Sequence, residues 1–284
     1  MAASPREVRA RVRAPRPKGC SRLGDTLWRR SVRPRRSSEI SLVNLSSSQD
    51  PLRISVVMPT LNEMSNIVAR AAEIQRQTGD WEWIVSDGGS RDGTVEAAER
   101  AGAKVVRSPR GRGIQLDAGA AASSGEVLLF LHADTSLPVG AFDAIRATLR
   151  RPAVVGGNFI MRFDEDTVIA RFLEVVYAGR QRFLRSYFGD SAIFARRSTY
   201  ESIGGFGSMP IMEDYAFCMA LQRRGATKRI PLSVVTSSRR YNNRVMKTIW
   251  DWFAIMTLYR LGVTPEKLAD RYRPNDAQQQ PPLP

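Results

Sequence analysis

A histidine and an aspartate directly follow an apolar run near the middle of the sequence. The run Val127–Leu131 lies between polar segments, as a buried central strand does, and His132 is the only histidine in the chain. In open α/β sheets, ligands bind just beyond the carboxyl ends of such strands. The spacing therefore delivers an imidazole and the Asp134 carboxylate, which exchange protons and bind cations, to the place where such a fold does its chemistry. The alternative is that Asp134 only starts a turn before Pro138.

Three further acidic positions lie beside predicted strand or helix ends. Glu63 follows the first predicted strand in PTLNE, Asp87 follows the second in SDGGSRDGT, and the pair Glu213-Asp214 opens a predicted helix. Each has a structural alternative, because Glu63 and Glu213 suit helix N-termini and Asp87 suits a turn. Their arrival at one sheet edge together with Asp134 is less easily explained by turns, so we predict a shared site.

The elements that must position these residues are predicted from residue 54 onward. Short apolar runs alternate with helical segments, in the order strand 54–58, helix 63–77, strand 83–85, helix 94–101, strand 104–107, helix 114–123 and strand 127–131. This alternation predicts an α/β fold whose sheet is mostly parallel, with right-handed crossovers.

The alternation changes in the second half. We predict strands at 158–162 and 191–195, a helix at 168–184 between them, and a helix at 212–224 that ends at Gly225. A long aromatic helix, 244–261, has two interpretations. Its Trp, Phe and Arg content suits a membrane surface beside a lipid-linked acceptor, but such a stripe is more often part of a core, and we favour the core.

Composition limits the class of protein. With 284 residues, 43% hydrophobic and 25% charged, the chain has ordinary globular values. Cys20 and Cys218 are too few for a disulfide framework or a four-ligand zinc site, so we expect free thiols in a reducing compartment. Neither a secretory signal nor an apolar run long enough to span a membrane is present. The expected location is the cytoplasm, with the membrane surface as a variant.

The charge is concentrated at the N-terminus. The net charge is +15, and residues 1–50 carry +8 of it through eleven Arg and one Lys against four acids. We predict a disordered basic extension over 1–52, a folded domain over 53–273 and a disordered tail over 274–284. The extension resembles a transit peptide for a plastid or mitochondrion, or else is a basic tail or the product of an upstream start codon. Nucleic-acid binding is disfavoured because Trp28 is the one interleaved aromatic residue.

Six motifs carry a resemblance to a known family. They are VVMPTLNE, VSDGGSRDGT, GRGIQLDAGAAASSGEVLLFLHADT, GDSAIFARRSTYESIGGF, MEDYAF and TSSRRY. Their order resembles glycosyltransferase family 2, which has the GT-A fold, and the resemblance covers residues 53–273. FLHADT, MPIMED and TSSRRY look most like a bacterial subgroup named for arsenosugar biosynthesis.

The resemblance implies a role for each matching residue. In the first half it implies nucleotide-sugar binding, with uracil as the base in many relatives. Asp134 would match the last carboxylate of the DxD motif and hold a divalent cation. Asp214 would match the catalytic carboxylate, and Glu213 beside it is the second catalytic candidate. The nucleotide-sugar-binding residues would be Pro59, Thr60, Glu63, Asp87 and Arg112.

The sequence departs from the family pattern at one position of the metal-binding motif. His132 stands where the family's DxD motif begins with Asp, and it fits either a cation ligand or a structural hydrogen-bonding residue. The implied cofactor is Mg²⁺ or Mn²⁺, and the implied reaction moves a sugar from a UDP-sugar or similar donor to an unknown acceptor by a single inverting displacement. The alternative is a catalytically inactive protein of the same fold that binds a nucleotide sugar.

Overall fold

The computed structural model describes residues 52–183, 187–237 and 245–271. The predicted N- and C-terminal tails lie outside these residues and stay predictions, and so do residues 238–241 of the motif TSSRRY. In chain order the elements are β1 (Ile54–Thr60), α1 (Met64–Gln75), β2 (Trp81–Asp87), α2 (Thr94–Arg100), β3 (Lys104–Arg107), α3 (Arg112–Ala121), β4 (Val127–Phe130), β5 (Thr135–Ser136), α4 (Ala141–Leu149), β6 (Val154–Phe163), α5 (Val168–Phe183), η1 (Gly189–Ser191), β7 (Ile193–Arg196), α6 (Arg197–Ile203), α7 (Glu213–Arg224), β8 (Ala226–Thr236), α8 (Val245–Arg260) and α9 (Pro265–Arg271).

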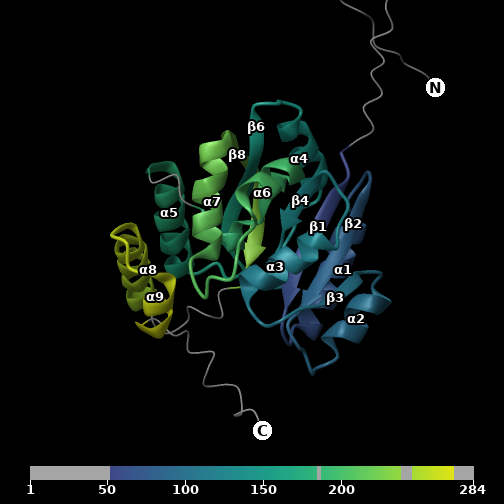
Figure 1. Cartoon of the computed structure of the whole chain (residues 1–284), viewed down its shortest axis with the longest axis horizontal. Coiled ribbons are helices and arrows are strands. Elements are labelled where there is room, and N and C mark those ends of the chain that lie inside the picture. Colours follow the sequence, from purple (N-terminus) through teal and green to yellow (C-terminus); the bar gives the residue numbers. More distant parts are fainter. Residues whose placement is uncertain (1–51, 184–186, 238–244, 272–284) are drawn as a thin grey trace, which may run out of the picture. The chain divides into compact units, whose positions relative to one another are not determined.

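One mixed sheet organises the described residues. Its strand order is β3-β2-β1-β4-β7-β6-β8-β5. Figure 1 shows this sheet, with β1 between β2 and β4. Strands β3, β2, β1 and β4 run parallel, as predicted for the first half. Strand β7 is antiparallel to both β4 and β6, while β6 and β8 are parallel to each other. The carboxyl ends of β1, β2, β4, β6 and β8 therefore share one edge of the sheet.

Helices cover both faces of the sheet. A core on one face joins the strands to α1, α2 and α4, and a core on the other face joins them to α3, α6 and α7. Helix α3 packs so closely that a Cβ on Gly119 would lie 2.5 Å from Cγ1 of Val57. This close contact fixes the height of α3 above β1, and with it the position of the first turn of α3 at the sheet edge.

Two smaller clusters hold the helices of the second half. Residues of β6 and α5 form one, with Trp252 of α8 packed against it. The other brings Ile255 and Met256 of α8 against Met212 and Tyr215 at the start of α7. None of the helices in the described part of the chain has the length and hydropathy that a membrane span requires.

The structure differs from the sequence expectations in several elements. Helix α3 begins at Arg112, two residues before the predicted start, and this places Arg112 in its first turn. Strand β8 was not predicted, because its exposed charged residues and Pro231 break the apolar alternation. The register shift between Phe159 and Ile160 of β6 leaves Pro231 outside the regular pairing. The short elements β5, α4, α6 and α9 were also not predicted.

Candidate active site

The loops that follow β1 and β2 are joined by hydrogen bonds at the shared sheet edge. The backbone N–H of Asn62 donates to Oγ of Ser90 at 2.8 Å, and the Arg91 N–H donates to Oδ1 of Asn62 at 2.9 Å. The Glu63 N–H donates to Oγ1 of Thr94 at 2.8 Å. Glu63 itself is the N-cap residue of α1, which agrees with its structural alternative as a helix-start residue.

Asp87 lies at the end of β2 with 2% of its surface exposed. Its Oδ2 accepts hydrogen bonds from the backbone N–H groups of Gly89 and Ser90, both at 2.9 Å. Its Oδ1 accepts from the Ser90 hydroxyl and, at 3.2 Å, from the Thr60 hydroxyl. A carboxylate has about four acceptor sites, so this loop occupies most of the hydrogen-bonding capacity of Asp87. The turn-forming role weighed in the sequence is therefore present.

Helix α3 connects these strand ends to the pair at the start of α7. Nε2 of Gln115 donates to the carbonyl oxygens of Thr60 and Ser86, at 2.8 and 3.0 Å. One turn earlier in α3, Nε of Arg112 donates to Oε1 of Glu213. The predicted phosphate-facing arginine is thus engaged with a carboxylate of α7, although 41% of its side chain stays exposed.

The acidic pair Glu213-Asp214 is buried, with 1% and 6% of the residue surfaces exposed. Met212, the N-cap residue, has a φ of 69°, and this left-handed conformation turns the chain sharply into α7. Oδ2 of Asp214 accepts from the Gly189 N–H at 2.9 Å, and its Oδ1 accepts from the Tyr215 N–H at 2.7 Å. Backbone groups therefore fix the orientation of the Asp214 carboxylate.

Arg112 and Glu213 are electrostatically linked. Burial disfavours the charge on the guanidinium, but attraction by the Glu213 and Asp214 carboxylates outweighs burial and raises the pKa of Arg112. Burial also raises the pKa of Glu213, against the attraction of Arg112, and the neighbouring negative charge of Asp214 adds to the rise. Arg112 therefore keeps its positive charge, and it lies beside the side chains of Glu213 and Asp214.

His132 and Asp134 follow β4 and lie on the same side of the sheet edge as Asp214. A Cβ placed on Gly189 would lie 2.6 Å from Nε2 of His132 and 3.5 Å from Oδ2 of Asp214. The His132 imidazole and the Asp214 carboxylate therefore both lie next to Gly189. Among the described residues, no three His, Cys, Asp or Glu side chains gather into a metal cage. A cation here would have to draw other ligands from its substrate or from water.

Asp190 is a site residue that the sequence reasoning missed, although it lies within the quoted motif GDSAIF. Its Oδ2 accepts from the Tyr177 hydroxyl at 2.5 Å, and its Oδ1 is buried with no hydrogen-bond partner among the described residues. Burial raises the pKa of Asp190 to about 6 against this hydrogen bond and the charge of Arg112, and the charges of Asp214 and Asp134 act in the same direction as burial. Asp190 thus joins the predicted carboxylates of Asp134, Glu213 and Asp214.

A methyl group at Gly189 should disturb this arrangement. Gly189→Ala places the new Cβ against the His132 ring, because the contact of 2.6 Å is far inside van der Waals distance. We expect a loss of about 1–3 kcal/mol in the free energy of unfolding, the usual cost of overpacking. Urea denaturation followed by circular dichroism measures this change.

Gly179→Ala provides the matched control. Gly179 lies in α5, and nothing lies within 4 Å of the position that its new methyl group would take, so alanine should keep or raise stability, by up to about 1 kcal/mol. Equal stabilities of the two variants would show that the space around Gly189 is open and that His132 does not press on it.

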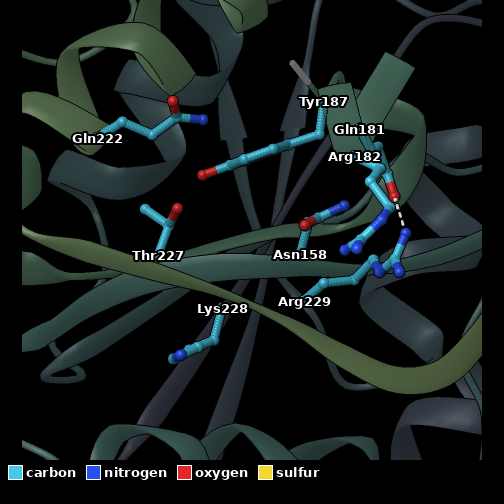
Figure 2. A pocket seen from close by; sticks show the side chains of 8 residues that line it. All are labelled: Asn158, Gln181, Arg182, Tyr187, Gln222, Thr227, Lys228 and Arg229. Carbon is cyan, nitrogen blue, oxygen red and sulfur yellow. Dashed lines mark hydrogen bonds between the residues drawn. The ribbon is translucent and has the colours of Figure 1, made fainter. Parts of the chain in front are cut away.

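A polar cavity lies apart from this cluster, and none of the predicted site residues lines it. Its volume is about 230 Å³. Figure 2 shows side chains from α5, α7 and the strands β6 and β8 around it, with a hydrogen bond of 3.1 Å from Nη1 of Arg229 to Oε1 of Gln181. Lys228 extends away from these two residues in this view. The remaining lining residues are Asn158, Arg182, Tyr187, Gln222 and Thr227.

The part of the sequence that forms this cluster matches a known protein family. Residues 55–230, more than half of the chain, match the family described as Glycosyl transferase family 2. The chain belongs to glycosyl transferase family 2. Uncharacterized glycosyltransferases of Mycobacterium tuberculosis and Mycobacterium bovis are 34% identical to this family 2 chain over 101 residues. Each match covers 35% of this chain and 45% of the relative, so it spans less than half of the relatives' length.

Solved structures show that the fold is GT-A. A mannosyltransferase from Pyrobaculum calidifontis, in complex with GDP-Man and Mn²⁺, has a TM-score of 0.55 at 19% identity, over 76% of this chain and 68% of that chain. Glucosyl-3-phosphoglycerate synthase from Mycobacterium tuberculosis, in complex with Mn²⁺, UDP and glucosyl-3-phosphoglycerate, has a TM-score of 0.54 at 22% identity, over 75% and 81%. These likenesses confirm the predicted fold class.

Proposed function

We propose that the chain transfers a sugar from a nucleotide-sugar donor to a hydroxyl group of an acceptor. The observation that carries this proposal is the convergence of His132 and Asp214 on Gly189, within a family 2 domain. Asp134 follows β4 and Asp214 opens α7, so a cation-binding carboxylate and a proton acceptor come from separate segments. Transfer to a hydroxyl group requires both functions.

The donor that we propose is a UDP-sugar or a similar nucleotide sugar, with Mg²⁺ or Mn²⁺ as the cofactor. In support, the two solved structures above were obtained with Mn²⁺ and with GDP-Man or UDP. The donor set of this chain fits such an ion. Mg²⁺ usually takes one or two carboxylates and completes its shell with substrate phosphate oxygens and water, and Asp134 with His132 offers that partial set.

In the proposed reaction, the acceptor oxygen attacks the anomeric carbon of the sugar while the bond from that carbon to the diphosphate oxygen breaks. Asp214 takes the proton of the attacking hydroxyl, since its carboxylate is held by the Gly189 and Tyr215 N–H groups. Such a single displacement inverts the anomeric centre. The cation supplies charge neutralisation of the leaving diphosphate. Arg112 holds the Glu213 carboxylate in place through their ion pair.

We assign the nucleotide to the ends of β1 and β2. Pro59, Thr60 and Glu63 lie in the first of these segments, and Asp87 closes the second. Asp87 orders the loop that would surround the base, and its contact with the base stays a prediction. Arg112 stays a proposed binding residue for the donor phosphates.

Other parts of the proposal rest on the sequence. They are the folded-domain limits 53–273, the tails on either side, and the cytoplasm as the location. Membership of the subgroup named for arsenosugar biosynthesis rests on FLHADT, MPIMED and TSSRRY and names no substrate by itself. The alternative, a nucleotide-sugar-binding protein without turnover, differs from the enzyme in one measurable respect, since it releases no nucleoside diphosphate from its donor.

Binding of nucleoside diphosphates should raise the melting temperature in a cation-dependent way. At 100 times the dissociation constant a ligand adds about 2.7 kcal/mol, which corresponds to a shift of about 5–10 °C for a domain of this size. Differential scanning fluorimetry with UDP, GDP, ADP and CDP, each with Mn²⁺, Mg²⁺ or EDTA, measures this shift. No shift with any nucleotide would contradict the proposal. A shift without nucleotide release from any UDP- or GDP-sugar would favour the inactive alternative.

A further inference from the structure

Helix α5 exposes an apolar stripe to solvent, in addition to the apolar face that it buries. Ala170, Leu173 and Tyr177 face the core of that region. On the other side, large apolar side chains stay exposed at helical spacing, with exposed fractions of 51–85%. These are Val168 (85%), Ile169 (52%), Phe172 (51%) and Val175 (69%). A surface helix of a globular protein normally has polar side chains on this side.

Helix α8, the aromatic helix of the sequence analysis, likewise has both buried and exposed apolar side chains. Ile255 and Met256 are buried against α7. Trp250 is 75% exposed, Phe253 is 37% exposed, and Leu261, directly after the helix, is 76% exposed. The steps of three and eight residues between them keep these side chains on one side of the helix. The core interpretation holds for the face that carries Ile255 and Met256, and the membrane-surface interpretation stays a prediction for the exposed face.

The two exposed stripes belong to neighbouring helices. Tyr177 of α5 and Trp252 of α8 contact each other with ring centroids 5.7 Å apart. The guanidinium carbon of Arg180, also on α5, lies 5.7 Å from the ring centroid of Phe253. Figure 1 shows α5 and α8 side by side at the border of the described structure. We call the exposed residues of the two helices the α5–α8 surface, comprising Val168, Ile169, Phe172, Val175, Trp250, Phe253 and Leu261.

We propose that the α5–α8 surface docks on a lipid bilayer with anionic headgroups. Large contiguous apolar surface marks an interaction site, and helices with Trp, Phe and aliphatic residues on one face lie in the membrane interface. Charge selects the bilayer. The chain carries a net +15. Arg182 of α5 lines one cavity with Lys228 and Arg229 of β8, and Nη1 of Arg229 donates to Oε1 of Gln181 of α5 at 3.1 Å. Cationic segments next to an apolar face are attracted to anionic lipid.

Docking would bring the bilayer close to the transfer site. The Tyr177 hydroxyl of α5 donates to Asp190 at 2.5 Å, and Nε of Arg260 of α8 donates to the Tyr215 hydroxyl at 2.7 Å. Tyr215 follows Asp214 directly. Both docking helices therefore contact residues that adjoin Gly189 and Asp214 in the sequence. If these residues carry out the proposed transfer, an acceptor held at the membrane would have a short path to them.

Vesicle co-sedimentation of the full chain tests the proposal without any measurement of transfer. The chain should sediment with vesicles of equal parts phosphatidylcholine and phosphatidylglycerol and much less with phosphatidylcholine alone. The double variant Val175→Asn, Trp250→Ser should partition about tenfold or more weakly, because it removes two large side chains from the apolar surface. It leaves every charge unchanged, so attraction by the basic N-terminal residues is equal in both proteins.

The matched control places polar residues at exposed apolar positions elsewhere. Val68 of α1 is 62% exposed and Val139 before α4 is 72% exposed, and Val68→Asn with Val139→Asn should bind vesicles as the parent chain does. Equal binding by the parent chain and the Val175, Trp250 variant would overturn the proposal. It would also be overturned if the parent chain forms a dimer that this variant loses, with no vesicle binding, since a second copy would then cover the surface.

Discussion

Asp214→Asn is expected to bind nucleotide and cation as the parent chain does and to lose transfer by a factor of about 10²–10⁴. The amide cannot take the proton of the acceptor hydroxyl. Its oxygen can still accept one of the backbone hydrogen bonds from Gly189 and Tyr215, so the fold around it should survive. Isothermal titration with nucleoside diphosphate and Mn²⁺, alongside the turnover of any donor that the parent chain accepts, separates the two effects.

Glu213→Gln and Asp190→Asn are the controls that decide the assignment. Glu213 is held by Arg112, and its glutamine variant should keep most of the transfer activity. Asp190 contacts Tyr177 and has a buried oxygen without a described partner, which makes it the strongest competitor for the role of base. Full transfer by Asp214→Asn, with loss in either control, would move the base to that residue.

Asp134→Asn should remove the cation dependence of donor binding. A neutral amide is a poorer ligand for a hard dication, and the loss in affinity should be at least about 10–100-fold, the range for loss of an outer-shell partner. Titration of UDP or GDP in Mn²⁺ and in EDTA should give similar, weak affinities for the variant and different ones for the parent chain.

Two comparisons sharpen this test. Glu99→Gln removes an exposed carboxylate from α2 that has no role in the proposed cation site, and it should change nothing. His132→Ala shows whether the imidazole acts with Asp134, because a ligand should lower Mn²⁺-dependent binding and a packing residue should lower stability alone. An Asp134→Asn variant with the parent cation dependence would place the cation elsewhere.

The first half of the fold was predictable because its strands are short apolar runs that end in polar turns. Residues 104–107 and the neighbouring parallel strands follow this pattern, and the structure confirms them. Strand β8 was hidden for a physical reason. It pairs with β6 at the edge of the larger core, so Lys228 and Arg229 stay exposed, and Pro231 sits where the pairing is irregular. Pairing partners far away in sequence compensate for this poor local pattern.

The site was predictable only in its residue types and strand ends. Asp134 and Asp87 could be named because they follow apolar strands, and the pair Glu213-Asp214 because it opens a predicted helix. The hydrogen bond from Gly189 to Asp214, and the burial of Asp190 beside it, join segments about 25 residues apart without any periodic pattern. Arg112 likewise reaches a carboxylate 101 positions further along the chain. Such contacts depend on the final packing of α3, η1 and α7.

Helix α3 connects the two parts of the candidate site, the ends of β1 and β2 and the start of α7. Gln115 fixes it to the ends of β1 and β2, and Arg112, on the same face one turn away, fixes it to Glu213. The ends of β1 and β2, where we propose that the nucleotide binds, and the start of α7 therefore cannot separate while both attachments hold. Any opening that admits a donor must either move the start of α7 together with α3 or break the Arg112–Glu213 ion pair, and an incoming diphosphate, itself an anion, competes with Glu213 for that same guanidinium.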